Sequence, residues 1–514
     1  MMTPRRTTRR TVLAGGLLTG VGVIAAACGS SGSGSGSGAK DQKSDIRFAD
    51  EPVPTTALSS DDPAALSTTL SSLLFSAATV AVVTAEDALD AFAPAAQSAQ
   101  VPILLSSATG AADELKRLGV TQIVTAQGAD LSALDTSAKP VELDPAAADL
   151  AKQMPKASVS EKTQPVTLLV STDQEDGPAR TLAQAMVTAA GGTIVEAAEA
   201  DPRATSDSVK AVLASAGKDS DGASGVLALG GSAADDAQLA EFAAVTASAP
   251  ELPGGGQLAF PGRRMIAAYG SPGVPSLGVL GEQPLEEAID LAKQLAADYE
   301  PYADGDTIVP AFEIITTVAS ASAGKDGDYS EEIDPAVINE WVDAAGKAGV
   351  YCVLDLQPGR TDFLTQAKLY EDILKKPHVG LALDSEWRLK ENQVHLRQIG
   401  SVTAAEVNTT TAWLADLVKK NKLPQKVLIL HQFHLGMITE RETLDASRPE
   451  LAMVLHADGH GTPEEKMSTW DALRQNLPEG IRMAWKNFYD EDTPMFTPEQ
   501  TFQVEPKPWF VSYQ

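Results

Sequence analysis

The carboxyl-terminal half of the chain alternates short apolar segments with longer amphipathic ones. The short segments are rich in Val, Ile, Leu and Ala, which is typical of buried strands. The longer segments carry apolar side chains at helical spacing, and two begin with the helix-start signals Asp334-Pro335 and Thr462-Pro463. The predicted strands cover residues 265–269, 308–313, 350–355, 379–384, 427–431, 452–456, 481–486 and 509–512.

Eight strands separated by helices over residues 264–514 predict a (β/α)8 TIM barrel. The alternative is a doubly wound open sheet, which gives no reason for an eighth strand at the very C-terminus. The predicted helices of this half cover residues 284–299, 334–348, 362–375, 403–420 and 462–476.

Residues 46–250 show a different alternation, with short β-branched strands and Ala-rich helices. A first unit is predicted from strands at 79–83, 101–105 and 122–125 and helices at 86–98 and 111–118. A weaker copy follows with strands at 166–170, 193–195 and 225–229. These units predict a parallel-sheet α/β domain with a degenerate repeat, joined to the barrel by a Pro/Gly-rich linker at 251–263.

The first 45 residues read as an export signal and a tether. Residues 5–10 hold four arginines, 11–27 are apolar, and small residues precede Cys28. This arrangement resembles a bacterial lipoprotein signal, and the stretch Thr8-Arg9-Arg10-Thr11-Val12-Leu13 resembles a twin-arginine export signal. The resemblance implies cleavage after residue 27, a lipid on Cys28 that anchors the protein to the membrane, and a location on its extracytoplasmic face. The Ser/Gly repeat within 28–45 is typical of a flexible tether. The alternative is an uncleaved N-terminal anchor.

Composition narrows the possible partners. The formal net charge of the 514 residues is −29, which argues against binding nucleic acid. Two cysteines exclude a disulfide framework, and Cys352 falls in the middle of a predicted strand, where we expect it in the core. All six histidines and all six tryptophans lie between Trp341 and Trp509, so the chemistry is expected in the barrel.

The catalytic residues of a TIM barrel lie at the carboxyl ends of its strands. Histidines, carboxylates and aromatic residues gather at these positions in the sequence, and we expect them to bind substrate. The expected binding residues are Tyr269, Glu313, Asp355, Gln357, Trp387, His431, His434, His456, Asp458, Trp485, Asn487 and Tyr489.

The segment 380–387, with the sequence GLALDSEW, carries the clearest local motif. Strand periodicity places Ala382, Asp384 and Glu386 toward the barrel axis, and Leu381 and Leu383 toward the helices. Two neighbouring carboxylates oppose each other's ionisation, so one can remain protonated near neutral pH. An acid beside a second carboxylate is the arrangement that glycoside cleavage requires.

This motif resembles the fourth-strand pattern of family 18 glycoside hydrolases, although Ala382 stands where the family has its first Asp. The resemblance implies that Glu386 is the general acid and that Asp384 is its supporting carboxylate. The first α/β unit resembles the type 2 cell-wall-binding repeat, through Asp87-Ala88-Leu89, Pro102-Ile103-Leu104-Leu105 and Leu115–Val120. The expected function is therefore that of an envelope lipoprotein that hydrolyses an envelope polysaccharide without a cofactor. The alternative is a non-catalytic glycan-binding or scaffold lipoprotein.

A metal-dependent hydrolase is a third possibility. His431, His434, His456, Asp458 and His460 could supply ligands together with Asp355 or Asp384. However, His431 and His434 cannot both face inward from one strand, and the first strand ends in Tyr269-Gly270-Ser271 without a pair of histidines. The sequence therefore assigns no metal.

Overall fold

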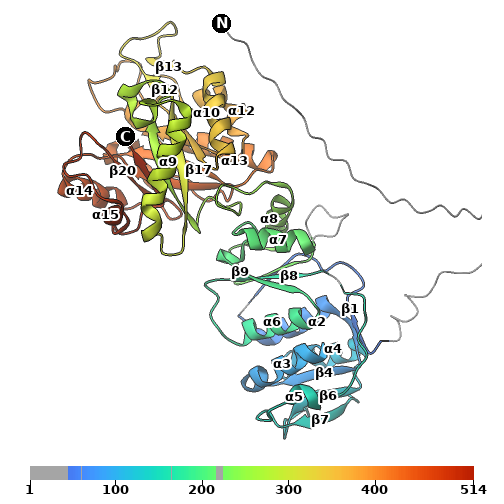
Figure 1. Cartoon of the computed structure of the whole chain (residues 1–514). Coiled ribbons are helices and arrows are strands. Elements are labelled where there is room, and N and C mark those ends of the chain that lie inside the picture. The colour runs from blue at the N-terminus through green and yellow to red at the C-terminus, as the bar shows by residue number, and fades with distance from the viewer. Residues whose placement is uncertain (1–43, 60, 164, 216–223) are drawn as a thin grey trace, which may run out of the picture. The chain divides into compact units, whose positions relative to one another are not determined.

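The computed structural model describes residues 44–514, except 60, 164 and 216–223 (Figure 1). The predicted signal, Cys28 and most of the predicted tether lie outside the described residues. None of the helices that the structure describes combines the length and apolar character needed to cross a bilayer.

The carboxyl-terminal half is a closed barrel of eight parallel strands, as predicted. The strands are β11 (Arg263–Gly270), β12 (Thr307–Ala319), β14 (Tyr351–Leu356), β15 (Val379–Asp384), β17 (Lys426–Gln432), β19 (Leu451–Ala457), β20 (Arg482–Asn487) and β21 (Phe510–Tyr513). Each strand pairs with the next, and β11 also pairs with β21, so the ring is closed and the open-sheet alternative is wrong. The short strand β13 (Ser330–Glu332) adds antiparallel to the end of β12.

Side chains alternate between the inside of the barrel and the helices outside it. Ala267, Ala311, Ala382 and Ile429 belong to the apolar core inside the ring. Leu381 and Leu383 belong to the outer core between strands and helices, as the strand periodicity predicted. The same alternation brings the polar residues at the strand ends to the mouth of the barrel.

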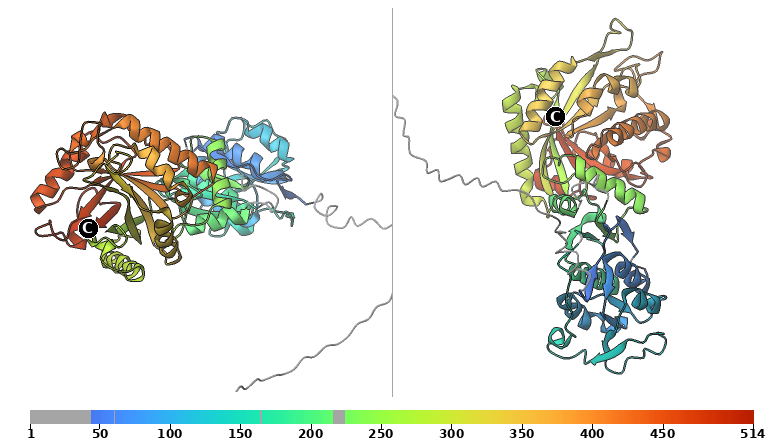
Figure 2. Two further views of the ribbon diagram at one scale, coloured as in Figure 1. Left: turned by 90° about the horizontal axis from the view of Figure 1, so that it is seen from above. Right: turned by 90° about the vertical axis from the view of Figure 1, so that its right-hand side faces the viewer.

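Helices surround the strands (Figure 2). They are α9 (Leu285–Tyr299), α10 (Pro335–Lys347), α11 (Phe363–Leu369), α12 (Glu371–Leu374), α13 (Ala404–Lys420), α14 (Pro463–Arg474) and α15 (Pro498–Phe502). Asp334 and Thr462 cap α10 and α14, as expected. The helix predicted over 362–375 is divided into α11 and α12 at Tyr370, which leaves the helical conformation while its hydroxyl donates to the Thr316 carbonyl.

The preceding α/β domain contains two four-stranded parallel sheets. One has the order β5-β4-β6-β7 and the other β2-β10-β8-β9. These strands are β2 (Thr56–Leu58), β4 (Val80–Thr84), β5 (Ile103–Leu105), β6 (Gln122–Ala126), β7 (Lys139–Leu143), β8 (Thr167–Ser171), β9 (Thr193–Ala197) and β10 (Val226–Leu229). In both sheets the first strand of the repeat (β4 or β8) lies between the second strand (β5 or β9) and the third strand (β6 or β10). The fourth strand is β7, which follows the repeat in the chain, in one sheet, and β2, which precedes both repeats, in the other.

The two sheets share a layer of helices (Figure 1). α2 (Pro63–Leu74), α3 (Leu89–Ala99) and α6 (Pro178–Ala189) pack together, and one apolar core takes residues from both sheets. The domain also contains α4 (Ala111–Leu118), α5 (Leu150–Gln153), α7 (Ser206–Ser215) and α8 (Asp236–Ser248). The short strands β1 (Ile46–Phe48) and β3 (Phe75–Ala78) pair antiparallel with each other. No helix or strand occurs between α8 and β11.

Candidate active site at the mouth of the barrel

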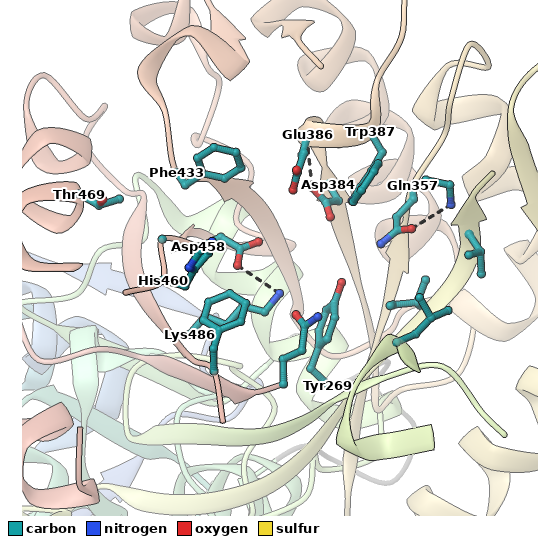
Figure 3. Close-up of a pocket in the computed structure, with 17 residues that line it drawn as sticks. Tyr269, Gln357, Asp384, Glu386, Trp387, Phe433, Asp458, His460, Thr469 and Lys486 are labelled. Atoms are coloured by element: carbon teal, nitrogen blue, oxygen red, sulfur yellow. Dashed lines mark hydrogen bonds and ion pairs between the residues drawn. The ribbon is translucent and has the colours of Figure 1, made fainter. Parts of the chain in front are cut away.

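A cavity of about 410 Å³ opens at the carboxyl ends of the barrel strands (Figure 3). Its lining mixes carboxylates, a lysine and aromatic rings, which suits a polar ligand with apolar faces. Six of the predicted site residues line it: Tyr269, Gln357, Asp384, Glu386, Trp387 and Asp458.

Asp384 and Glu386 take their places from the way β15 ends. Asp384 is the last residue of the strand, and residues Ser385–Trp387 form a single 3-10 turn. Asp384 Oδ1 accepts a hydrogen bond from the Glu386 backbone N–H at 3.2 Å and so caps this turn. Both carboxyl groups consequently reach the same cavity, as the spacing predicted.

The surroundings of these two carboxyl groups favour their neutral forms. Burial, together with the nearby charge of Asp458, raises the pKa of Glu386 to about 7. Burial also raises the pKa of Asp384 well above its ordinary value, and the neighbouring Asp355 adds to this. At neutral pH Glu386 is therefore poised to give up a proton, while burial favours the neutral form of Asp384.

His431 is a buried cation below the cavity floor. Its Nε2 donates to Glu313 Oε1 at 2.8 Å and its Nδ1 donates to Asp458 Oδ2 at 2.9 Å. Burial alone would lower the pKa of His431, but the charges of Glu313 and Asp355 raise it well above its ordinary value. Because both ring nitrogens donate, His431 is an imidazolium that links two carboxylates.

Asp458 is held as a carboxylate on the cavity wall. Its Oδ1 lies 3.2 Å from Lys486 Nζ, and its other oxygen accepts from His431. Burial alone would raise the pKa of Asp458, but the charges of Lys486 and His431 hold it below its ordinary value. The Lys486 ammonium also lies 3.7 Å from the centre of the Tyr269 ring, which holds it over the floor.

Four predicted binding residues lie beneath the cavity and do not line it: Glu313, Asp355, His431 and His456. Asp355 accepts from the Tyr269 hydroxyl at 2.8 Å, and burial raises its pKa to about 6. Burial lowers the pKa of His456 to about 4, and its Nε2 lies 3.2 Å from the Trp485 carbonyl. On its strand, each of these residues occupies the inward-facing position just before the one that lines the cavity. The four residues therefore support the cavity floor from below.

Trp485 and Asn487 point away from the cavity. On β20 the alternation turns Ala484 and Lys486 inward and the odd-numbered residues outward. Trp485 is buried among the helices, stacks on Phe496 at 5.1 Å between ring centres, and donates from Nε1 to Asn487 Oδ1 at 2.8 Å. The expectation that they bind substrate is therefore not supported by their positions.

His434 and Tyr489 also lie off the cavity. His434 is exposed beyond the end of β17, where its Nδ1 accepts the Gly436 N–H at 3.1 Å. Tyr489 is 43% exposed and lines a separate surface depression. Both follow a strand end in the sequence, but the loop path carries them outward.

Lys486 is the main residue absent from the predicted set. Strand periodicity counted from the small residue Ala484 turns Lys486 inward, whereas the predicted set contains its outward-facing neighbours Trp485 and Asn487. Phe433 and Phe488 also line the cavity, as does His460, which the sequence offered only as a possible metal ligand. They lie in loops whose course no periodicity indicates.

Two groups of described residues place possible metal ligands close together: Glu313, His431 and His456, and Asp384, His431 and Asp458. Both groups depend on His431, whose two ring nitrogens already donate to carboxylates. A metal ion bound to His431 would have to replace one of its ring protons, so the contacts with Glu313 and Asp458 fit a protonated His431 better than a metal ligand.

No protein-family model matches this chain, and no curated protein matches it significantly.

Proposed function

We propose that this protein is a glycoside hydrolase of the bacterial cell envelope. The observation that carries the proposal is the pairing of Glu386, whose pKa is raised to about 7, with the ionised Asp458 in one open cavity. Environments that separate the pKa values of two carboxyl groups divide the acid role from the charged role. Glycoside hydrolysis requires this division.

In the proposed reaction, Glu386 transfers its proton to the glycosidic oxygen as the bond from that oxygen to the anomeric carbon breaks. The Asp458 carboxylate stabilises the positive charge that develops on the sugar ring. Water then supplies the hydroxyl group of the new reducing end, and its remaining proton restores Glu386. The balanced result is one glycosidic bond exchanged for two hydroxyl groups.

In this proposal Asp384 is not the charged supporting carboxylate that the sequence predicted, because Asp458 has that role. A neutral carboxyl group can donate a hydrogen bond, so Asp384 is suited to hold a substrate hydroxyl or amide oxygen. Trp387 is only partly buried and offers a ring surface at the same cavity. Such surfaces pack against the C–H faces of sugars.

The proposed location follows from the N-terminal sequence. Export through the twin-arginine-like signal and a lipid on Cys28 would confine the enzyme to the outer face of the membrane, within reach of envelope polysaccharide. The repeated α/β units preceding the barrel support a wall-facing module. Because the first unit resembles the wall-binding repeat, the proposed role of this domain is to bind the cell wall.

The test is release of reducing ends from purified wall polysaccharide by the wild type and by Glu386→Gln. We expect the variant to lose about 10²–10⁴-fold in rate, which is the range for removing a general acid. Glu391→Gln is the matched control, because Glu391 is an exposed glutamate on the same loop. If the wild type binds wall polysaccharide yet releases no sugar, the non-catalytic glycan-binding alternative is correct.

A further inference from the structure

A second depression adjoins the cavity along the rim of the barrel. It has a volume of about 290 Å³ and is formed by residues 395–399 together with Glu386 and Trp387. The same two residues line the central cavity. The candidate acid therefore stands at the boundary between two binding spaces and not at the end of one.

We call this depression, formed by residues 395–399 with Glu386 and Trp387, the rim groove. We propose that the rim groove binds the leaving-group side of a glycan chain, so that the enzyme cleaves a polysaccharide internally. The inference rests on the proposed function. A general acid must contact the oxygen that joins the two halves of its substrate. With the cleaved sugar beside Asp458 in the central cavity, the next sugars extend past Glu386 into the groove.

The groove is anchored to the segment that carries the acid. The Gly400 N–H donates to the Glu386 carbonyl at 2.7 Å, and Ser401 N–H donates to the Arg388 carbonyl at 3.0 Å. A Cβ at Gly400 would lie 2.2 Å from the Glu386 carbonyl oxygen, so a side chain there would separate the two segments. His395 meets the Trp387 ring edge to face at 5.3 Å and bonds the Tyr329 carbonyl at 2.9 Å.

The groove also exposes apolar side chains to solvent beside its polar residues. Leu396 is 85% exposed and Ile399 is 47% exposed. Leu396 holds a φ of +62°, a strained conformation for a leucine, and it does so without any gain in burial. Exposed aliphatic side chains beside a tryptophan and the polar Arg397 and Gln398 match the mixed surface of a sugar chain.

The test compares Leu396→Asp with the wild type on wall oligosaccharides separated by length into disaccharide, tetrasaccharide and hexasaccharide fractions. We expect kcat/KM of the wild type to rise with length, and the products of the hexasaccharide to include internal fragments. Leu396→Asp should lower kcat/KM for the hexasaccharide about tenfold relative to the disaccharide, the order expected for one lost packing contact in a site. Leu396→Met should restore the length dependence.

Leu369→Asp is the matched control, because Leu369 is a 51% exposed leucine on α11, away from the groove. An unchanged length dependence in Leu396→Asp would overturn the groove assignment, and products made only of terminal sugars would overturn internal cleavage. Both outcomes leave hydrolysis in place. Failure of the wild type to cleave any fraction would instead overturn the proposed function.

Discussion

Lys486 and Asp458 form an ion pair of 3.2 Å in the wall of the barrel-mouth cavity, and both side chains are more than nine-tenths buried. The pair holds Asp458 as a carboxylate in the cavity that Glu386 also lines. It also makes the charge state of Asp458 depend on Lys486.

Replacing Lys486 by Met should therefore raise the pKa of Asp458 and shift the acidic limb of the kcat/KM profile to higher pH. The physical reason is the loss of the nearest positive charge from a buried carboxylate. The measurement is the pH dependence of reducing-end release. Lys390→Met, at an exposed lysine near the rim, is the control and should leave the profile unchanged. An acidic limb that stays in place would show that Asp458 does not carry the essential charge.

The pKa of Glu386 also predicts how stability varies with pH. The folded state raises this pKa from 4.5 to about 7, so folding favours the protonated form. This contribution to stability is fully present below pH 4.5 and is lost as pH rises through 7. Glu386→Gln cannot ionise, so its melting temperature relative to the wild type should increase between pH 5 and pH 8. A difference that is constant with pH would contradict the raised pKa.

His431 and His434 should differ sharply when each is replaced by Ala. Removing the His431 imidazolium leaves Glu313 and Asp458 buried beside an empty space, and breaking a buried ion pair in this way costs about 3–5 kcal/mol. His434 is exposed, and its replacement should change the free energy of unfolding by less than about 0.5 kcal/mol. Urea denaturation measures both. Equal effects would contradict the buried bridging role of His431.

Trp387 and Trp485 provide a parallel contrast between binding and packing. Trp387→Ala should weaken binding of wall oligosaccharide, because Trp387 lines both the cavity and the rim groove. Trp485→Ala should cost about 3–5 kcal/mol of stability, because Trp485 is buried between β20 and the outer helices. Affinity and urea denaturation of each variant separate the two effects. A stable Trp485→Ala protein with impaired binding would contradict the outward placement of Trp485.

Much of the barrel could be predicted because its strands are short apolar runs bounded by capped helices. Periodicity also placed Ala382 and Asp384 inside, and Leu381 and Leu383 outside. The same rule, applied to Ala484, would have found Lys486 in place of Trp485. Periodicity does not show how deep along the barrel axis a side chain lies. Glu313 and His456 face inward as expected but lie below the cavity floor.

Other features depend on long-range pairing and loop paths, which local sequence does not encode. β2 completes a sheet with β10, whose residues are far along the chain. His434 and Tyr489 follow strand ends but are carried outward by their loops. The rim groove exists because residues 395–400 fold back onto the Glu386 segment through Gly400, which no motif in that stretch indicates.

The most direct test of the central claim is kcat/KM for hydrolysis of purified wall polysaccharide, measured against pH for the wild type and for Glu386→Gln. We expect the wild-type rate to fall as pH rises, with a midpoint of about 7 as Glu386 loses its proton. Glu386→Gln should be at least about 100-fold slower and should lack this limb. Hydrolysis by Glu386→Gln at the wild-type rate, with the same pH dependence, would contradict the role assigned to Glu386.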